Sequence, residues 1–165
     1  MAENVNLDEL VFEADRITRA EGFNLNYQHS RFVVYCRDNN VRLVAHLTKG
    51  RDVTSHRRLV QQSGVKPHAN GFYGEALEDG SGRILGGGDV DISDDAKVVK
   101  LSGTSGDYGG LPENVLQALA PKVLEACREH FPSLEEIKIK VDPRAQSARL
   151  VRHEGQIYKV DEYGR

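Results

Sequence analysis

Hydrophobic positions near the start of the chain recur with the period of a helix. They are Leu7, Leu10, Val11, Ala14 and Ile17. The preceding Asn6-Leu7-Asp8-Glu9 has the form of a capping box, and Gly22 is a typical C-terminal stop. This pattern predicts a helix over residues 7–21.

Several later segments instead carry the patterns of strands. "RFVVYCR" (31–37) and "VRLVAHLT" (41–48) are apolar, and the "DNN" between them is hairpin turn chemistry. "GRILGGGDVDI" and "AKVVKLSG" predict a second antiparallel pair, and "LEEIKIKV" (134–141) alternates strictly. "ARLVRHEGQIYKVDE" (148–162) predicts a terminal hairpin that turns at Glu154-Gly155.

The strongest helical pattern lies between two prolines, over 112–131. Its apolar positions form one wide stripe that includes Cys127, which is why that thiol is expected in the core. Weaker patterns predict helices within 52–64 and 67–80. The whole predicts one α+β domain over 1–165, with a mixed, mostly antiparallel sheet packed against helices.

Composition narrows the function classes. The net charge is −3, and the basic residues between Lys49 and Lys66 are not interleaved with aromatics, so nucleic acid is not expected as a partner. There is no membrane-spanning apolar run and no secretory signal, and the two cysteines are far apart in the sequence. These features predict a cytoplasmic protein with free thiols and no membrane partner.

A glycine-rich segment, "LSGTSGDYGGLPENV", joins a predicted strand to the predicted helix at Pro112. Successive loop amides at a helix start form a concave anion site, to which the Thr104 and Ser105 hydroxyls would add donors. The alternative is a tight turn with no ligand, and the carboxylate of Asp107 would repel a phosphate. Gly86 to Gly88 form a second cluster, which we interpret as a strand passing close to another backbone.

Histidines and acids offer further candidates. His68 follows Pro67 at an element boundary, where it could serve as base or nucleophile, although a lone histidine is more often a surface or core residue. No histidine or cysteine spacing suits zinc. The acids at 89, 91, 94 and 95 lack the pattern of a calcium loop and are interpreted as exposed turn residues.

Together, "HANGFYGEALEDG", "ILGGGDV", "KLSGTSGDYGG", the helix 112–131 and "IKIKV" resemble the protein histidine phosphatase (janus-ocnus) family over roughly residues 40–141. Members are small α/β proteins that remove phosphate from phosphohistidine without a metal or cofactor. The resemblance implies a histidine-phosphatase-like core, a predicted N-terminal helix and a C-terminal hairpin added to it, and a phosphorylated protein or small phosphoramidate as substrate.

The resemblance implies the following site. His68 takes the place of the catalytic histidine, activating water or accepting the phosphoryl group. The phosphate is held by the amides of Thr104, Ser105, Gly106, Asp107 and Tyr108, by the Ser105 hydroxyl, and by Arg42, which matches a basic residue on the family's first strand.

The chain also departs from the family's pattern. Asp89 stands where the family has an arginine after the three glycines, and another family arginine falls at Gln61. Asp107 replaces a small residue in the loop. Lost positive and added negative charges disfavour a dianion in a dry pocket. Two hypotheses follow, namely a metal-independent phosphohydrolase and a non-catalytic binding or regulatory module on the same fold.

Overall fold

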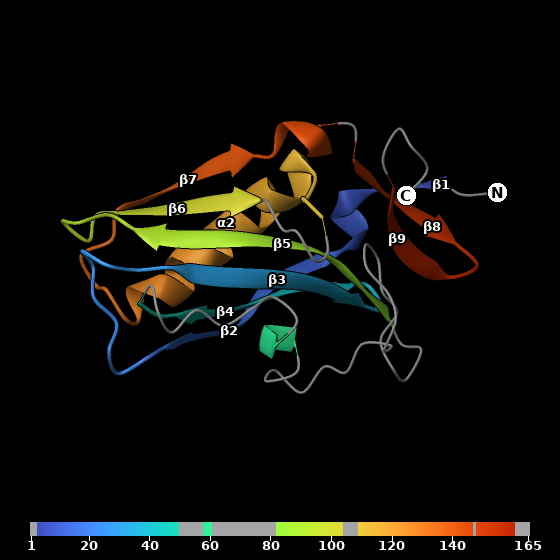
Figure 1. The fold of residues 1–165 in the computed structure, drawn as a ribbon. Helices are drawn as coiled ribbons and strands as arrows, with labels where there is room; N and C mark the ends of the chain where they lie inside the picture. Colours follow the sequence, from blue (N-terminus) through green and yellow to red (C-terminus); the bar gives the residue numbers. More distant parts are fainter. Residues whose placement is uncertain (1–2, 50–57, 61–81, 104–108, 147, 161–165) are drawn as a thin grey trace.

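The computed structural model describes residues 3–49, 58–60, 82–103, 109–146 and 148–160, and it contains two sheets and one long helix (Figure 1). The larger sheet has the order β2-β4-β3-β5-β6-β7, and the smaller has the order β1-β8-β9. The strands of the larger sheet are β2 (Val11–Arg19), β3 (Ser30–Arg37), β4 (Asn40–Leu47), β5 (Gly82–Ile92), β6 (Val98–Gly103) and β7 (Glu136–Val141). Those of the smaller are β1 (Glu3–Asn4), β8 (Arg149–His153) and β9 (Gln156–Val160), and the long helix is α2 (Glu113–Arg128).

The pairing confirms the predicted α+β class with a mixed, mostly antiparallel sheet. Strands β2 and β4 run parallel, as do β6 and β7, and the other strand pairs are antiparallel. The predicted hairpins at β3–β4, β5–β6 and β8–β9 are all present. Asp38, Glu154 and Gly155 adopt positive φ at two of their turns (55°, 51° and 79°), as tight hairpin turns require.

Alternation along β3 shows how the larger sheet is buried on both faces. Phe32 and Val34 pack in the main core, which also contains the apolar stripe of α2. Val33 and Tyr35 point to the opposite face, where they cluster with Leu59 and Val60 of the helical segment 58–60. A strand that is buried on both faces has a nearly continuous run of apolar residues in its sequence, as "RFVVYC" shows.

The predicted helix over 7–21 is wrong. Leu7–Glu9 form a short 3-10 helix capped by the Asn6 side chain, and β2 follows as a strand. A β-bulge between Ala14 and Arg16 adds one residue to β2. Phe12 and Ile17, five positions apart, therefore both pack against the core, whereas a regular strand would place them on opposite faces. The bulge thus breaks the alternation by which a strand is recognised in a sequence.

The predicted helix over 112–131 and the strand over 134–141 are confirmed as α2 and β7, somewhat shorter than expected. The predicted helix over 67–80 lies outside the described residues. Of the segment 52–64, residues 58–60 are described, and they are helical.

The smaller sheet joins the two ends of the described chain, because β1 pairs with β8 (Figure 1). Leu150 and Ile157 of the hairpin reach the main core. Arg83 of β5 stacks on the Tyr158 ring at 4.0 Å and donates a hydrogen bond of 3.0 Å to its hydroxyl. The C-terminal hairpin is therefore packed against the larger sheet.

The cluster Gly86 to Gly88 has the predicted role of close backbone approach. These glycines lie on β5 opposite Val34, Val33 and Phe32. A Cβ on Gly88 would overlap the Ser102 carbonyl oxygen and lie 2.7 Å from the Phe32 ring. Any larger residue would push β5 away from β6.

The two cysteines are free thiols, and both are buried in the main core. Burial raises the pKa of each thiol to about 12. Among the described residues, no helix is long and apolar enough to cross a membrane.

Candidate functional site

The residues predicted to bind phosphate are only partly within the described structure. His68 and the five loop residues Thr104, Ser105, Gly106, Asp107 and Tyr108 lie outside the described residues. The structure describes Arg42, both ends of the loop at Gly103 and Gly109, and the start of α2. The site is therefore built here from its described surroundings.

The connection from β6 to α2 is closely packed at both of its ends. The Gly109 carbonyl accepts a hydrogen bond of 3.2 Å from the Gly87 amide of β5. A Cβ on Gly110 would lie 2.8 Å from the Gly103 carbonyl oxygen and 2.9 Å from the Ala145 Cβ. Only a glycine lets these three backbone segments meet, so the predicted role of the second glycine cluster, shaping a helix start, is confirmed at its described end.

The first turn of α2 has no side-chain cap. Pro112 is the N-cap residue and contributes no capping hydrogen bond. Its carbonyl accepts from the amides of Val115 and Leu116 at 3.1 and 3.2 Å. The backbone amides of the first turn lie at the N-terminal end of the helix dipole, which favours negative charge.

Lys159 of β9 brings a positive charge to this helix start. Its ammonium Nζ donates a hydrogen bond of 2.8 Å to the Gly110 carbonyl oxygen. Sequence reasoning missed Lys159, because nothing in the spacing of a C-terminal hairpin indicates that it packs beside a loop some fifty residues earlier. The only sequence signal was its place on the alternating strand "QIYKV".

The 3-10 helix η3 (Pro143–Ala145) closes the other side of Gly110. Asp142, buried at its start, accepts hydrogen bonds from the Arg144 backbone amide and guanidinium at 3.0 to 3.3 Å. Burial acts to raise the pKa of Asp142, but the hydrogen bonds from Arg144 outweigh it and hold that pKa below its ordinary value. The carboxylate is thus neutralised locally, and most of the Arg144 side chain is exposed.

Arg42 of β4 belongs to a compact polar cluster with carboxylates. Its Nε lies 3.5 Å from the Glu13 carboxylate of β2. Tyr35 of β3 donates a hydrogen bond of 2.7 Å to Asp15, and its hydroxyl also interacts with Arg42, which raises the pKa of that guanidinium. Burial and the bond to Asp15 raise the pKa of Tyr35. The positive charge of Arg42 is therefore partly balanced by β2.

Asp89 lies on β5, not in a turn. It is opposite Arg31 of β3 and Ser102 of β6, and its carboxylate is 4.0 Å from His29 Nε2. Asp91, two residues further, also lies on β5, and burial followed by repulsion from Asp89 raises its pKa. The prediction of exposed turn acids is thus wrong for these two residues.

Asp94 and Asp95 do lie in the β5–β6 turn, as predicted. Asp95 accepts hydrogen bonds from the Ser93 hydroxyl and the Lys97 amide, which lower its pKa.

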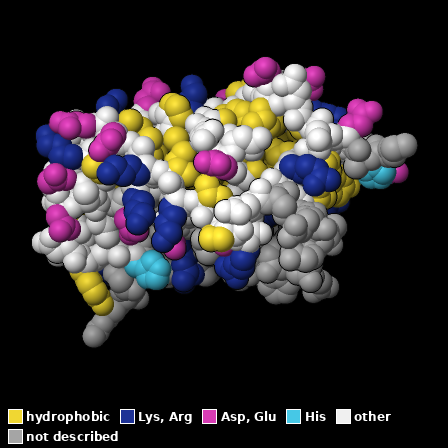
Figure 2. Space-filling model, turned by 90° about the horizontal axis from the view of Figure 1, so that it is seen from above, with side chains coloured by type: hydrophobic (Ala, Val, Ile, Leu, Met, Phe, Trp, Pro, Cys, Tyr) yellow, Lys and Arg dark blue, Asp and Glu magenta, His cyan; other side chains and the backbone are white. Residues whose placement is uncertain are grey.

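Basic side chains lie on the neighbouring strands β6 and β7, at Lys100, Lys138 and Lys140. Figure 2, which looks onto the β7 side, shows Lys and Arg side chains grouped toward its lower left.

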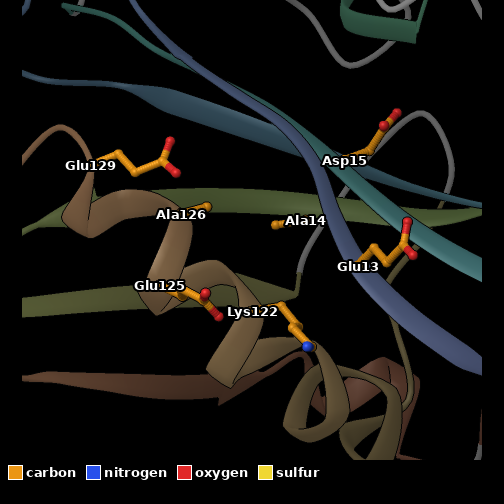
Figure 3. A pocket seen from close by; sticks show the side chains of 7 residues that line it. All are labelled: Glu13, Ala14, Asp15, Lys122, Glu125, Ala126 and Glu129. Atoms are coloured by element: carbon orange, nitrogen blue, oxygen red, sulfur yellow. The ribbon is translucent and has the colours of Figure 1, made fainter.

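A groove lies between the edge strand β2 and the C-terminal half of α2 (Figure 3). It has a volume of about 340 Å³. Its lining residues are Glu13, Ala14, Asp15, Lys122, Glu125, Ala126 and Glu129. Glu125, Glu129 and Lys122 of α2 lie beside it, whereas the carboxylates of Glu13 and Asp15 point away from α2, toward Arg42 and Tyr35 (Figure 3).

In the part of the chain that the structure describes, no group of three or more His, Cys, Asp or Glu side chains is placed to hold a metal ion. Comparison with protein-family models, with curated proteins and with solved structures gave no match to this chain.

Proposed function

We propose that this chain is a divergent phosphohistidine-phosphatase-like protein, a metal-independent phosphohydrolase that uses His68. The loop 104–108 and the start of α2 bind the phosphoryl group. Water attacks phosphorus directly, or His68 first accepts the phosphoryl group and water then releases it. The P–N bond breaks, and the leaving nitrogen takes a proton.

The observation that carries the proposal is the charge at the described end of the loop. Lys159 Nζ contacts the Gly110 carbonyl beside an α2 start without a side-chain cap. A helix start together with a cation favours a bound anion. In the family's pattern an arginine supplies positive charge at the position where this chain has Asp89. In this proposal Lys159 supplies that positive charge instead.

The assay is hydrolysis of free phosphohistidine and phospholysine by the full chain, measured as released inorganic phosphate. We expect turnover by the wild type and a loss of at least about a hundredfold in His68→Ala, the usual range for a general acid or base. His153→Ala is the matched control, because His153 lies exposed on the hairpin. Equal turnover by wild type and His68→Ala would reject the enzyme.

The second candidate is a binding or regulatory module on the same fold. It is favoured by Arg42, whose charge is already engaged by Glu13 and by the Tyr35–Asp15 pair. An arginine held this way is less available for a phosphate. Phosphate binding without turnover would support this module over the enzyme.

A further inference from the structure

The open side of β2 is the starting point. Among the described strands, β2 pairs only with β4 and forms one edge of the six-stranded sheet. An edge strand presents main-chain N–H and C=O groups to any extended segment that comes alongside. One such group is already used, because the Ile17 carbonyl lies 2.9 Å from His130 Nε2 just beyond α2. A carbonyl can only accept, so His130 donates.

The groove beside this edge has room for a backbone. Ala14 of β2 and Ala126 of α2 are small, and both are partly exposed between the two elements (Figure 3). At one end the groove is closed by the hydrogen bond from His130 to the Ile17 carbonyl. Arg19 also closes this end, because it donates a hydrogen bond of 3.3 Å to the His130 carbonyl. The side chains that rise around Ala14 and Ala126 are long and charged.

The charges around the groove are unfavourable in the chain alone. Glu125 and Glu129 are exposed and one turn apart on α2, where like charges repel. They also lie at the C-terminal end of the helix, where its dipole favours cations. Lys122 offsets part of this charge, and the carboxylates of Glu13 and Asp15 on β2 point away from α2, toward Arg42 and Tyr35.

We propose that this groove binds an extended segment of a partner protein that carries lysine or arginine at alternate positions, added as a further strand beside β2. Main-chain hydrogen bonds to β2 give the segment its register, as in other cases of strand addition. Its cations on one face lie against Glu125 and Glu129. The proposal is independent of the phosphohydrolase, because it uses the opposite end of α2.

The probe is a short fluorescein-labelled peptide of alternating lysine and threonine, added to the full chain at low ionic strength and followed by fluorescence anisotropy. We expect binding that weakens with salt, and a loss of at least about fivefold in affinity in Glu125→Gln/Glu129→Gln. The matched control, Glu113→Gln/Glu136→Gln, removes the same charge at exposed positions outside the groove and should bind within about twofold of wild type. Circular dichroism checks that each variant is folded.

A second probe separates strand addition from general attraction of a polycation. The same peptide with all its backbone amides N-methylated keeps its charge but can donate no main-chain hydrogen bond to β2, and it should bind several-fold more weakly. Equal binding of the two peptides overturns the proposal, as does unchanged affinity in Glu125→Gln/Glu129→Gln. A concentration-dependent dimer of the chain that the same variant dissolves would also overturn it, because a second copy would then be the occupant.

Discussion

The two ends of α2 differ in charge, and each has nearby charges of the sign that the helix dipole disfavours. At the N-terminal end, Lys159 contacts the Gly110 carbonyl and no side chain caps the first turn. At the C-terminal end, Glu125 and Glu129 line an acidic groove. Stability alone would place acids at the start and bases at the end. Glu113 and Arg128 do follow that rule, but Arg128 donates to the Leu134 and Glu135 carbonyls.

The charges at the two ends of α2 indicate which kind of ligand each end could bind. A charge arrangement that costs stability in the chain alone is relieved when a ligand of opposite charge binds. The N-terminal end is thus suited to an anion and the C-terminal end to a cationic segment.

Both ends belong to one packed helix, and the two buried thiols provide a test of this packing. Cys127 lies on α2 and Cys36 on β3, in one core. Burial raises the pKa of both thiols from 9.0 to about 12. Above pH 9 the unfolded chain loses these protons and the folded chain keeps them, so stability should fall by several kcal/mol as pH rises from 9 towards 12.

Urea unfolding at several pH values measures this fall. In Cys36→Ala/Cys127→Ala the thiol contribution is absent, so the decline over the same pH range should be clearly flatter than in wild type. An identical decline would show that the thiols are accessible in the folded chain, contrary to the packing described.

At the N-terminal end, Gly110→Ala should disrupt the junction. The new Cβ would lie 2.8 Å from the Gly103 carbonyl oxygen and 2.9 Å from the Ala145 Cβ, and neither can move far. We expect a loss of about 1–3 kcal/mol in the free energy of unfolding, together with weaker phosphate binding. Gly22→Ala is the control, since its Cβ would make only ordinary contacts, 3.5 to 3.7 Å from the Lys49 side chain. Phosphate affinity equal in the two variants would separate Gly110 from the proposed site.

Lys159→Met should weaken phosphate binding about threefold to tenfold while changing stability little, because one partly exposed charge contributes modestly. Isothermal titration with inorganic phosphate measures this effect. Lys138→Met removes an equivalent charge from exposed β7 and should leave the affinity unchanged. If both variants lost affinity equally, the effect would come from net charge and not from the position of Lys159.

At the C-terminal end, Glu125→Gln/Glu129→Gln should stabilise the free chain slightly, by about 0.3–0.8 kcal/mol, because it removes repulsion and an unfavourable dipole interaction. Thermal unfolding checks the sign. A lower midpoint in this variant would mean that the carboxylates have stabilising partners, and the contrast between the helix ends would be lost.

Much of the fold was predictable from local patterns. The apolar runs of β3 and β4, the alternation of β7 and the stripe of α2 each report burial that the structure confirms. The segment that became β2 was not predictable in this way. Its bulge at Asp15 interrupts the alternation of inward positions, and its parallel pairing with β4 is a long-range contact that no local pattern encodes.

The sequence predicted the candidate site only where close backbone contacts require glycine. Gly88 was expected at a close backbone approach and Gly110 in a loop at a helix start, and the structure places both there. Lys159 and the groove at β2 arise from tertiary packing between segments far apart in the chain. The predicted roles of His68 and residues 104–108 stay predictions.

The most direct test is a titration of the ¹⁵N-labelled chain with inorganic phosphate, followed by NMR at the backbone amides. The account predicts saturable shifts at Ser105, at Gly110 and in the first turn of α2, with residues 122–129 unchanged. No shift at the helix start, or equal shifts at both ends of α2, would contradict the assignment of an anion site to the N-terminal end.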